Sequence, residues 1–194
     1  KDSKYAQSKV NGEKKIRENL LEATIIKPSV VHSIDDNFST KLLSLLRILP
    51  LFPLYYNGDT KFSPIHASEV AELISFIISK RILFKDIEAI GPEVLSFKKI
   101  IKILLKSINK NRILLPLPLS FAKVLAFFFQ LLPNPLLTVD QLRLLKYDNI
   151  KSEQGVTNFD IGCPSKISFE ESVNSYSYNW RDGGKYSIDK IRDL

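Results

Sequence analysis

The first 38 residues place a tyrosine and a lysine on a helix that leads directly into a short strand. Tyr5 and Lys9 are four residues apart, so on a helix both side chains project from one face, one turn apart. The β-branched run at residues 23–26 then predicts a buried strand, which Pro28 ends. A helix that precedes a buried strand, followed by further strand and helix patterns, predicts an α/β fold.

This helix pattern has two different faces. Charged residues between positions 13 and 18 supply a solvated side. Val10, Ile16 and Leu20 fall on another side, and the pattern predicts that they face the protein interior.

A phenol beside an ammonium group is suited to proton transfer. The positive charge favours the phenolate, and such a phenol can exchange a proton with a carbonyl or alcohol oxygen near neutral pH. The spacing Tyr-x-x-x-Lys also begins at Tyr147 and Tyr186, but only the first copy has the following strand and its exit at 27–31. If the chain is an enzyme, Tyr5 and Lys9 are therefore the predicted catalytic pair.

Several segments in a fixed order resemble one protein family. They include SKYAQSK at 3–9, ATIIKPSVV at 23–31 and DDNF at 35–38, and the resemblance extends from Ser3 to Ile161. The pattern resembles the extended and atypical short-chain dehydrogenase/reductase family. Within that family it is most similar to the NAD(P)H-binding accessory subunits of respiratory complex I and their bacterial relatives. The resemblance implies the C-terminal part of a Rossmann-like fold, with the last sheet strands and a smaller mixed α/β substrate domain.

The resemblance also implies how a dinucleotide is held. Tyr5 would be the general acid/base, and Lys9 would lower its pKa and bind the nicotinamide ribose of NADP or NAD. The residues at the strand exit would border the nicotinamide; these are Pro28, Ser29, Val30 and Val31.

Two histidines are candidates for the substrate cleft. His66 lies in a segment that resembles the family's P-V-H-V-x-D-V-A element, with Glu69 in place of the Asp. We favour a hydrogen-bonded His66 that fixes the turn from strand to helix over a proton-transfer role. His32 and Ser33 stand where the family has an aromatic residue followed by Gly. A side chain at Ser33 narrows the ligand approach, which favours a subunit that binds without turnover.

The chain divides into three predicted parts. Residues 1–38 end the nucleotide-binding domain, residues 39–175 form the substrate domain with some return to the sheet, and residues 176–194 form a tail. Trp180 in this tail is either an anchor on another protein or part of a solvated terminus. The sequence begins at Lys1, lacks Met and contains no Gly-rich phosphate turn. We therefore expect a fragment that lacks the N-terminal nucleotide-binding half.

Apolar periodicity and capping residues predict the remaining elements. Ser39, Ser96, Thr138 and Ser168 are the expected helix N-caps. A very apolar helix is expected at 119–132, either in the core or lying on a membrane or partner. The other helices are expected at 40–49, from 67 or 68 onward, 97–108, 139–147 and after 168, and strands at 61–66, 86–90 and 112–115. An Asn-Gly turn is expected at 57–58, an irregular polar segment at 149–161, and Asp140 in the first turn of its helix, where the helix dipole favours it.

Charge and cysteine content exclude some functions. The formal net charge of +7 is spread without a dense basic run, which argues against nucleic-acid binding. It is compatible with an acidic partner or peripheral contact with an anionic membrane. A single cysteine, Cys163, excludes an intramolecular disulfide and a zinc cluster, and no metal site is expected.

Three functions remain open at this point. The first is an accessory subunit of complex I with a structural cofactor, located in the cytoplasm or on the inner face of an energy-transducing membrane. The second is an active NAD(P)-dependent reductase or epimerase, whose substrate is a nucleotide sugar or a small quinone- or lipid-linked carbonyl. The third is a binding module in which the Tyr5–Lys9 spacing is a coincidence.

Overall fold

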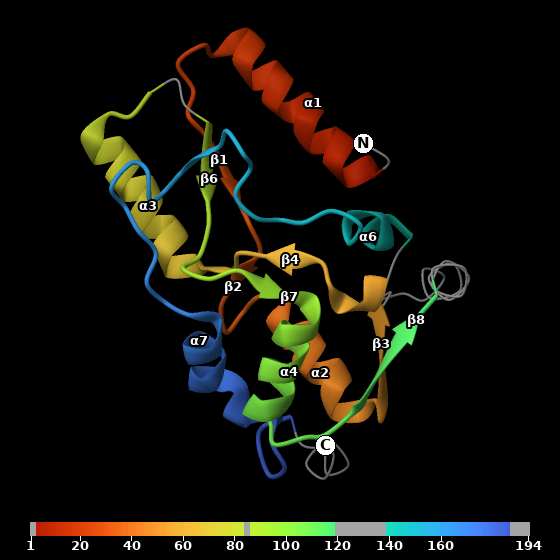
Figure 1. Ribbon diagram of the computed structural model, residues 1–194. Helices are drawn as coiled ribbons and strands as arrows, with labels where there is room; N and C mark the ends of the chain where they lie inside the picture. The colour runs from red at the N-terminus through yellow and green to blue at the C-terminus, as the bar shows by residue number, and fades with distance from the viewer. Residues whose placement is uncertain (1–2, 84–85, 119–138, 187–194) are drawn as a thin grey trace.

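The computed structural model describes residues 3–83, 86–118 and 139–186, and its centre is a parallel three-stranded sheet (Figure 1). The strands lie in the order β1 (Ile25–Pro28), β6 (Asp86–Ala89) and β9 (Val156–Thr157). β1 and β6 are the predicted strands. The expectation of an irregular segment around β9 was wrong, because these two residues pair with Ile87 and Glu88. The later part of the chain thus returns to the sheet that the first part begins.

Three two-stranded sheets extend the fold away from this centre. They pair β2 (Val31–His32) with β5 (Ile65–His66), β3 (Leu51–Tyr55) with β8 (Ile113–Leu117), and β4 (Lys61–Phe62) with β7 (Leu95–Ser96). The first two pairs are parallel and the third is antiparallel. The predicted Asn-Gly turn is the short 3-10 helix η1 (Tyr56–Gly58), in which both residues have positive φ.

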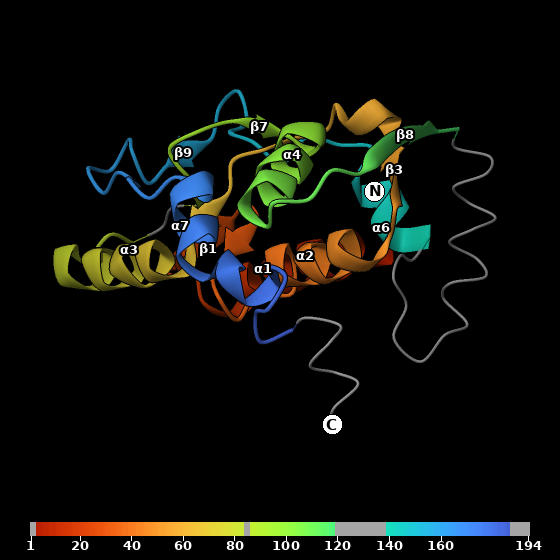
Figure 2. The same cartoon turned by 90° about the horizontal axis from the view of Figure 1, so that it is seen from below.

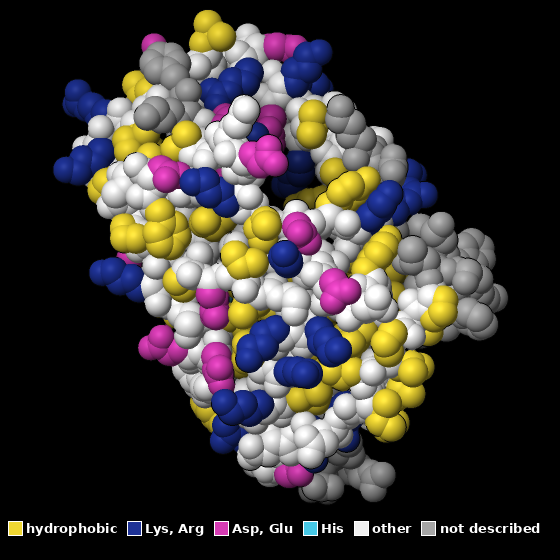
Figure 3. Space-filling model, viewed as in Figure 1, with side chains coloured by type: hydrophobic (Ala, Val, Ile, Leu, Met, Phe, Trp, Pro, Cys, Tyr) yellow, Lys and Arg dark blue, Asp and Glu magenta, His cyan; other side chains and the backbone are white. Residues whose placement is uncertain are grey.

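The main core lies among helices that are far apart in the sequence. α2 (Ser39–Ile48), α4 (Phe97–Ser107) and α7 (Phe169–Tyr176) lie side by side in both ribbon views (Figures 1 and 2). α4 follows its predicted pattern, with lysines outward, and Figure 3 shows Lys and Arg side chains gathered over it. Its apolar stripe packs between the other two helices. Fully buried side chains of this core include Leu43, Leu46, Ile100, Ile101, Leu104 and Phe169.

A second, smaller core joins the central sheet to α3 (Ala67–Lys80). Leu73 and Ile77 of the helix pack with Ile65, Ile87 and Ala89 of the strands. This arrangement follows the apolar periodicity of the α3 sequence.

Two of the three predicted serine N-caps are confirmed. Ser96 accepts a hydrogen bond from the Lys99 amide, and Ser168 accepts one from the Glu171 amide. The prediction for Ser39 was wrong. Ser39 lies inside α2, and Asp36 binds the free amides of this terminus instead.

A predicted helix and a predicted N-cap fall outside the part of the chain that the structure describes. The helix expected at 119–132 and the cap expected at Thr138 lie outside the described residues. The helix that follows is shorter than expected and is α6 (Val139–Leu144).

α1 (Lys4–Asn19) differs from the other long helices because none of its residues is buried among the described parts of the chain. The prediction that Val10, Ile16 and Leu20 face inward is therefore wrong for this structure, in which they are 61%, 43% and 64% exposed. The described residues that touch α1 do so mainly through polar groups.

Trp180 is part of the main core. It ends η2 (Ser177–Trp180), is 5% exposed, and its Nε1 donates a hydrogen bond to Ser44 Oγ at 2.9 Å. The prediction of a Trp180 free to anchor on another protein, or solvated, was wrong because η2 packs against α2.

Candidate functional site

The position of Tyr5 is fixed by a carboxylate from the far end of the sequence. Asp140, at the start of α6, accepts hydrogen bonds from Ser3 Oγ at 2.8 Å and from the amides of Lys4 and Tyr5 at 2.9 and 3.2 Å. Ser3 itself is the N-cap and accepts from the Ala6 amide. These hydrogen bonds, the one from Ser3 first, lower the pKa of Asp140. A negative charge at a helix N-terminus is also favoured by the helix dipole.

The other half of α1 is tied to the sheet by charges. Lys27 of β1 places its Nζ 2.8 Å from Glu13 and 3.0 Å from Asp86, and Arg17 also bonds Asp86. The hydrogen bond to Glu13 is the main cause of a raised pKa at Lys27. Burial acts to raise the pKa of Asp86, but the bonds from Lys27 and Arg17 outweigh it and lower that pKa.

A cavity of about 580 Å³ opens beside Tyr5. Its polar lining residues are all exposed, whereas its apolar lining residues are all half-buried or buried. The polar set is Tyr5, Asn37, Lys41, Tyr147, Asp148 and Asn149. The apolar set includes Val30, Phe38, Leu42, Leu45, Phe62 and Phe97. The cavity therefore has a polar rim and an apolar interior.

The structure brings part of the predicted dinucleotide site to this cavity. Tyr5 and Val30 both line it. Lys9 is not a lining residue, but its Nζ lies 5.4 Å from the centre of the Tyr5 ring in a cation–π contact. Of the predicted site residues, Tyr5 and Val30 therefore line the cavity, and Lys9 contacts Tyr5.

The remaining strand-exit residues mainly support the backbone. The Ser29 side chain is buried, donates to the Asn149 carbonyl at 2.8 Å and accepts from the Ser63 amide at 3.2 Å. It therefore connects the end of β1 to Asn149 at the cavity rim. Val31 packs with the second core, and Pro28 is exposed.

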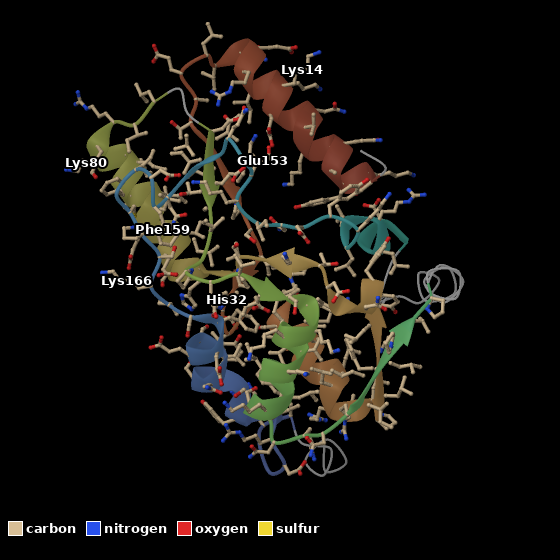
Figure 4. The ribbon with its side chains drawn as sticks, viewed as in Figure 1. Lys14, His32, Lys80, Glu153, Phe159 and Lys166 are labelled. Atoms are coloured by element: carbon tan, nitrogen blue, oxygen red, sulfur yellow. The ribbon has the colours of Figure 1, made fainter. Side chains whose placement is uncertain are left out.

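His32 lies in the core and does not line the cavity. It is fully buried, with Nδ1 3.1 Å from Ser172 Oγ and its ring 5.1 Å from that of Phe169 (Figure 4). Burial, and then the nearby His66, lower the pKa of His32 to about 4. A neutral His32 in this position has a packing role.

His66 fixes the start of α3, as predicted. Its Nδ1 accepts from the Ser68 amide at 3.3 Å and lies 2.7 Å from Ser68 Oγ. Glu69, three residues after His66, is buried and accepts hydrogen bonds from the amides of Lys166 and Ile167. Neither His66 nor Glu69 lines the cavity.

Several residues of this site were not identified from the sequence. Asp140 was expected only to favour its own helix, and the rim residues Asn37, Asp148 and Asn149 were not singled out. No local signal could have identified them, because Asp140 contacts Ser3 across 137 positions and Asn149 contacts Ser29 across 120.

In residues 3–83, 86–118 and 139–186, no three His, Cys, Asp or Glu side chains are placed to hold a metal ion together. In the same residues, no helix has both the length and the apolar character needed to cross a membrane.

No family model matches the chain. It is, however, similar to curated mitochondrial proteins. It is 25% identical over 177 residues to the NADH dehydrogenase [ubiquinone] 1 alpha subcomplex subunit 9 of Arabidopsis thaliana, covering 85% of this chain and 44% of that protein. It is 23% identical over 191 residues to the NADH-ubiquinone oxidoreductase 40 kDa subunit of Neurospora crassa, covering 96% and 49%. The chain thus spans about half the length of the curated relatives it matches.

A solved structure shows the same fold. The dTDP-glucose 4,6-dehydratase of Bacillus anthracis, in complex with NAD, superposes with a TM-score of 0.61 at 13% identity, covering 92% of this chain and 52% of that one. The expected fold class is confirmed: the chain has an α/β fold that corresponds to about half of an extended, Rossmann-like short-chain dehydrogenase. The expected resemblance to complex I subunits is confirmed as well.

Proposed function

We propose that this chain is part of a short-chain-dehydrogenase-like, NAD(P)H-binding accessory subunit of respiratory complex I, in which the cofactor is structural. The observation that carries the proposal is the similarity, over 85% and 96% of the chain, to subunits of that enzyme from a plant and a fungus. The partners proposed from this similarity are other complex I subunits.

The residues beside the cavity fit the nicotinamide end of NAD or NADP. The Tyr5 hydroxyl and the Lys9 ammonium are hydrogen-bond donors for a ribose, and Val30 offers an apolar contact for a flat ring. Pro28, Ser29 and Val31 would shape the backbone at this point. When bound, the cofactor supplies the hydride chemistry, and the protein supplies placement and proton exchange. The phosphate-binding turn is proposed to belong to an N-terminal half of the fold.

The loop after β2 supports binding without turnover. Ser33 replaces the family's Gly, and its amide donates to Asp36 Oδ2 at 3.0 Å while its Oγ accepts from the Asp35 amide. Asp36 also accepts from the amides of Phe38 and Thr40. Ser33 is therefore part of the polar turn that starts α2, not a flexible approach to a ligand.

The proposed location is the inner face of the energy-transducing membrane, with the chain attached peripherally through its partners. The names of the relatives include the word mitochondrial, and this supports such a location for them. Within the chain, we propose residues 1–38 as the end of the nucleotide domain, 39–175 as the substrate domain with some return to the sheet, and 176–194 as a tail whose first residues, up to Trp180, pack in the main core.

The test uses the complete protein in its own cells. A tagged version is purified from membranes solubilised in mild detergent, and bound NADPH and co-purified NADH-ubiquinone oxidoreductase subunits are measured. We expect both to be present, and Tyr5→Phe to leave the subunit association unchanged. Tyr178→Phe, at a tyrosine that is 56% exposed and lines no described cavity, is the matched control. Absence of the complex I subunits from the wild-type preparation would contradict the proposal.

A second candidate is an active reductase or epimerase, favoured by the presence of Tyr5 at the rim of a cavity in a dehydratase fold. Tyr5 would then exchange a proton with the substrate oxygen, and Lys9 would support the ionised phenol. This candidate predicts that Tyr5→Phe retains NADPH but loses carbonyl reduction, whereas Tyr178→Phe retains both. Equal activity in the two variants would exclude it.

A further inference from the structure

We infer that the cavity beside Tyr5 binds an amphiphilic ligand, with a long hydrocarbon chain in the interior and a polar or carbonyl head group at the rim. This deepens the proposed function by naming the ligand class of the site. It rests on that function only for the dinucleotide that would lie beside the head group.

The first argument is the difference in burial among the apolar residues of α2 and its N-cap. Leu43 and Leu46 are fully buried in the main core. Phe38, Leu42 and Leu45 are spaced at i, i+4 and i+7, so these three residues share one side of the helix. These three line the cavity and are only half-buried. These three side chains pack against the main core and leave part of their apolar surface toward the cavity.

The second argument is the aromatic floor. Phe62 and Phe97 are buried, and their ring centres lie 6.4 Å apart, with Phe38 6.2 Å from Phe62. Aromatic rings placed in this way are suited to contact with a hydrocarbon chain. The floor belongs to three separate elements, so the main core holds it in place.

The third argument is the position of the polar groups. In the described chain, every polar side chain that lines the cavity is exposed and lies at the rim, including Tyr5, Tyr147 and Asn149. A nucleotide sugar carries phosphates and hydroxyls along its length, and burying them without partners is costly. A hydrocarbon chain has no such requirement, and its polar end would meet the rim.

The volume is suitable for such a ligand. About 580 Å³ falls within the range of roughly 300–1,000 Å³ that is common for small-molecule sites. Transfer of each methylene from water to an apolar site is favourable by an amount that corresponds to about fourfold in affinity. The interior therefore selects for chain length, and Tyr5 is placed to contact the head group.

The experiment uses the complete purified protein that contains this chain, and cis-parinaric acid, a fatty acid whose fluorescence rises in apolar surroundings. Unlabelled fatty acids of increasing length are then used as competitors. We expect saturable binding and competition that strengthens about fourfold per methylene until the interior is full. Leu45→Trp fills the cavity and should weaken binding by about tenfold or more.

The matched control is Val94→Trp, at a side chain that is 58% exposed and lines no described cavity. It should bind the probe as the wild type does. If Leu45→Trp unfolds in a thermal melt, Leu42→Gln decides the question, because a buried amide without a partner also weakens binding of a hydrocarbon chain. Equal affinity in wild type and the cavity variants, no saturable binding, or displacement of the probe by UDP-glucose would each overturn the inference.

The outcomes for the inference and for the proposed function can be separated. Fatty-acid binding by the chain without association with complex I would support the inference and reject the proposed subunit role. Association with complex I without fatty-acid binding would support the subunit role and reject the inference.

Discussion

α1 and α4 are both amphipathic, lysine-rich helices, yet they are held in opposite ways. α4 buries most of its apolar side chains between α2 and α7, and Leu104 is fully inaccessible. α1 buries none among the described residues and is held by Asp140 at one end and by Arg17, Glu13 and Lys27 toward the other. The helix that carries Tyr5 and Lys9 is therefore positioned by polar contacts, whereas the helix that supports the cavity floor is positioned by apolar packing.

This difference matters for function, because the two kinds of contact respond to different conditions. Apolar packing depends little on salt or on pH near neutrality. Ion pairs and charged hydrogen bonds weaken with salt and with protonation of the carboxylates. The predicted catalytic pair should accordingly be easier to displace than the cavity beside it.

The largest expected change in the free energy of unfolding comes from removing a buried apolar side chain of α4, and the comparison is the removal of an exposed one from α1. Leu104→Ala in α4 should lower the free energy of unfolding by about 2–5 kcal/mol, because it leaves a cavity in the core. Val10→Ala in α1 should change it by no more than about 0.5 kcal/mol, because that side chain is exposed. Urea unfolding measures both. A large loss for Val10→Ala would mean that the apolar face of α1 is packed in solution, and the contrast would fail.

The second prediction concerns pH and the core. Burial lowers the pKa of His32 to about 4, so the unfolded state binds a proton near pH 6.5 that the folded state does not. The contribution of neutral His32 to the free energy of unfolding is therefore complete above pH 6.5 and is lost as pH falls from 6.5 toward 4. The expected loss is at most about 3 kcal/mol.

Unfolding titrations of His32→Asn test this pH dependence. The variant should be less stable at neutral pH, since Ser172 and Phe169 lose their contacts, but its stability should fall less steeply between pH 6.5 and 4. His66→Asn should reduce the slope only in part, because the His66 ring lies 5.4 Å from that of His32 and is the second cause of its lowered pKa after burial. An unchanged slope in His32→Asn would show that the buried ring does not cause the dependence.

The third prediction concerns the ion pairs of α1. Asp86→Asn removes the partner shared by Arg17 and Lys27 and should cost up to about 1 kcal/mol, less at high salt. Because its folded pKa is lowered, the Asp86 contribution is present above 3.8 and is lost as pH falls below that value. Asp182→Asn, which removes a more exposed carboxylate from its pair with Lys110, is the control with no measurable effect expected. Insensitivity of the Asp86 effect to salt would argue for packing instead.

The smallest effect on global stability is expected at Asp140, although its local effect is clear. Asp140→Ala should speed amide hydrogen exchange at the start of α1, where the Lys4 and Tyr5 amides lose their acceptor, and leave α4 unchanged. The mirror variant Ser96→Ala should speed exchange at the start of α4 and leave α1 unchanged. Exchange that rises at both helices in either variant would show that the two regions unfold together.

The sequence determined the features that depend on neighbours within one or two turns. The caps at Ser96 and Ser168 join a side chain to an amide three residues later, so a local pattern was sufficient to predict them. The apolar stripe of α4 follows from the period of the helix in the same way. The Tyr5–Lys9 pair and the strand at β1 were also local, and the ordered segments indicated the fold family.

Only the tertiary structure decided which of these residues are buried and what they contact. His32 contacts Ser172 across 140 positions, and Trp180 contacts Ser44 across 136. Asp140, whose carboxylate binds the start of α1, is 137 positions from Ser3. The cavity forms only when α2, β4, α4 and the segment after α6 meet. Helical period and capping act over a few residues and are visible in the sequence, whereas burial depends on which distant surfaces come together.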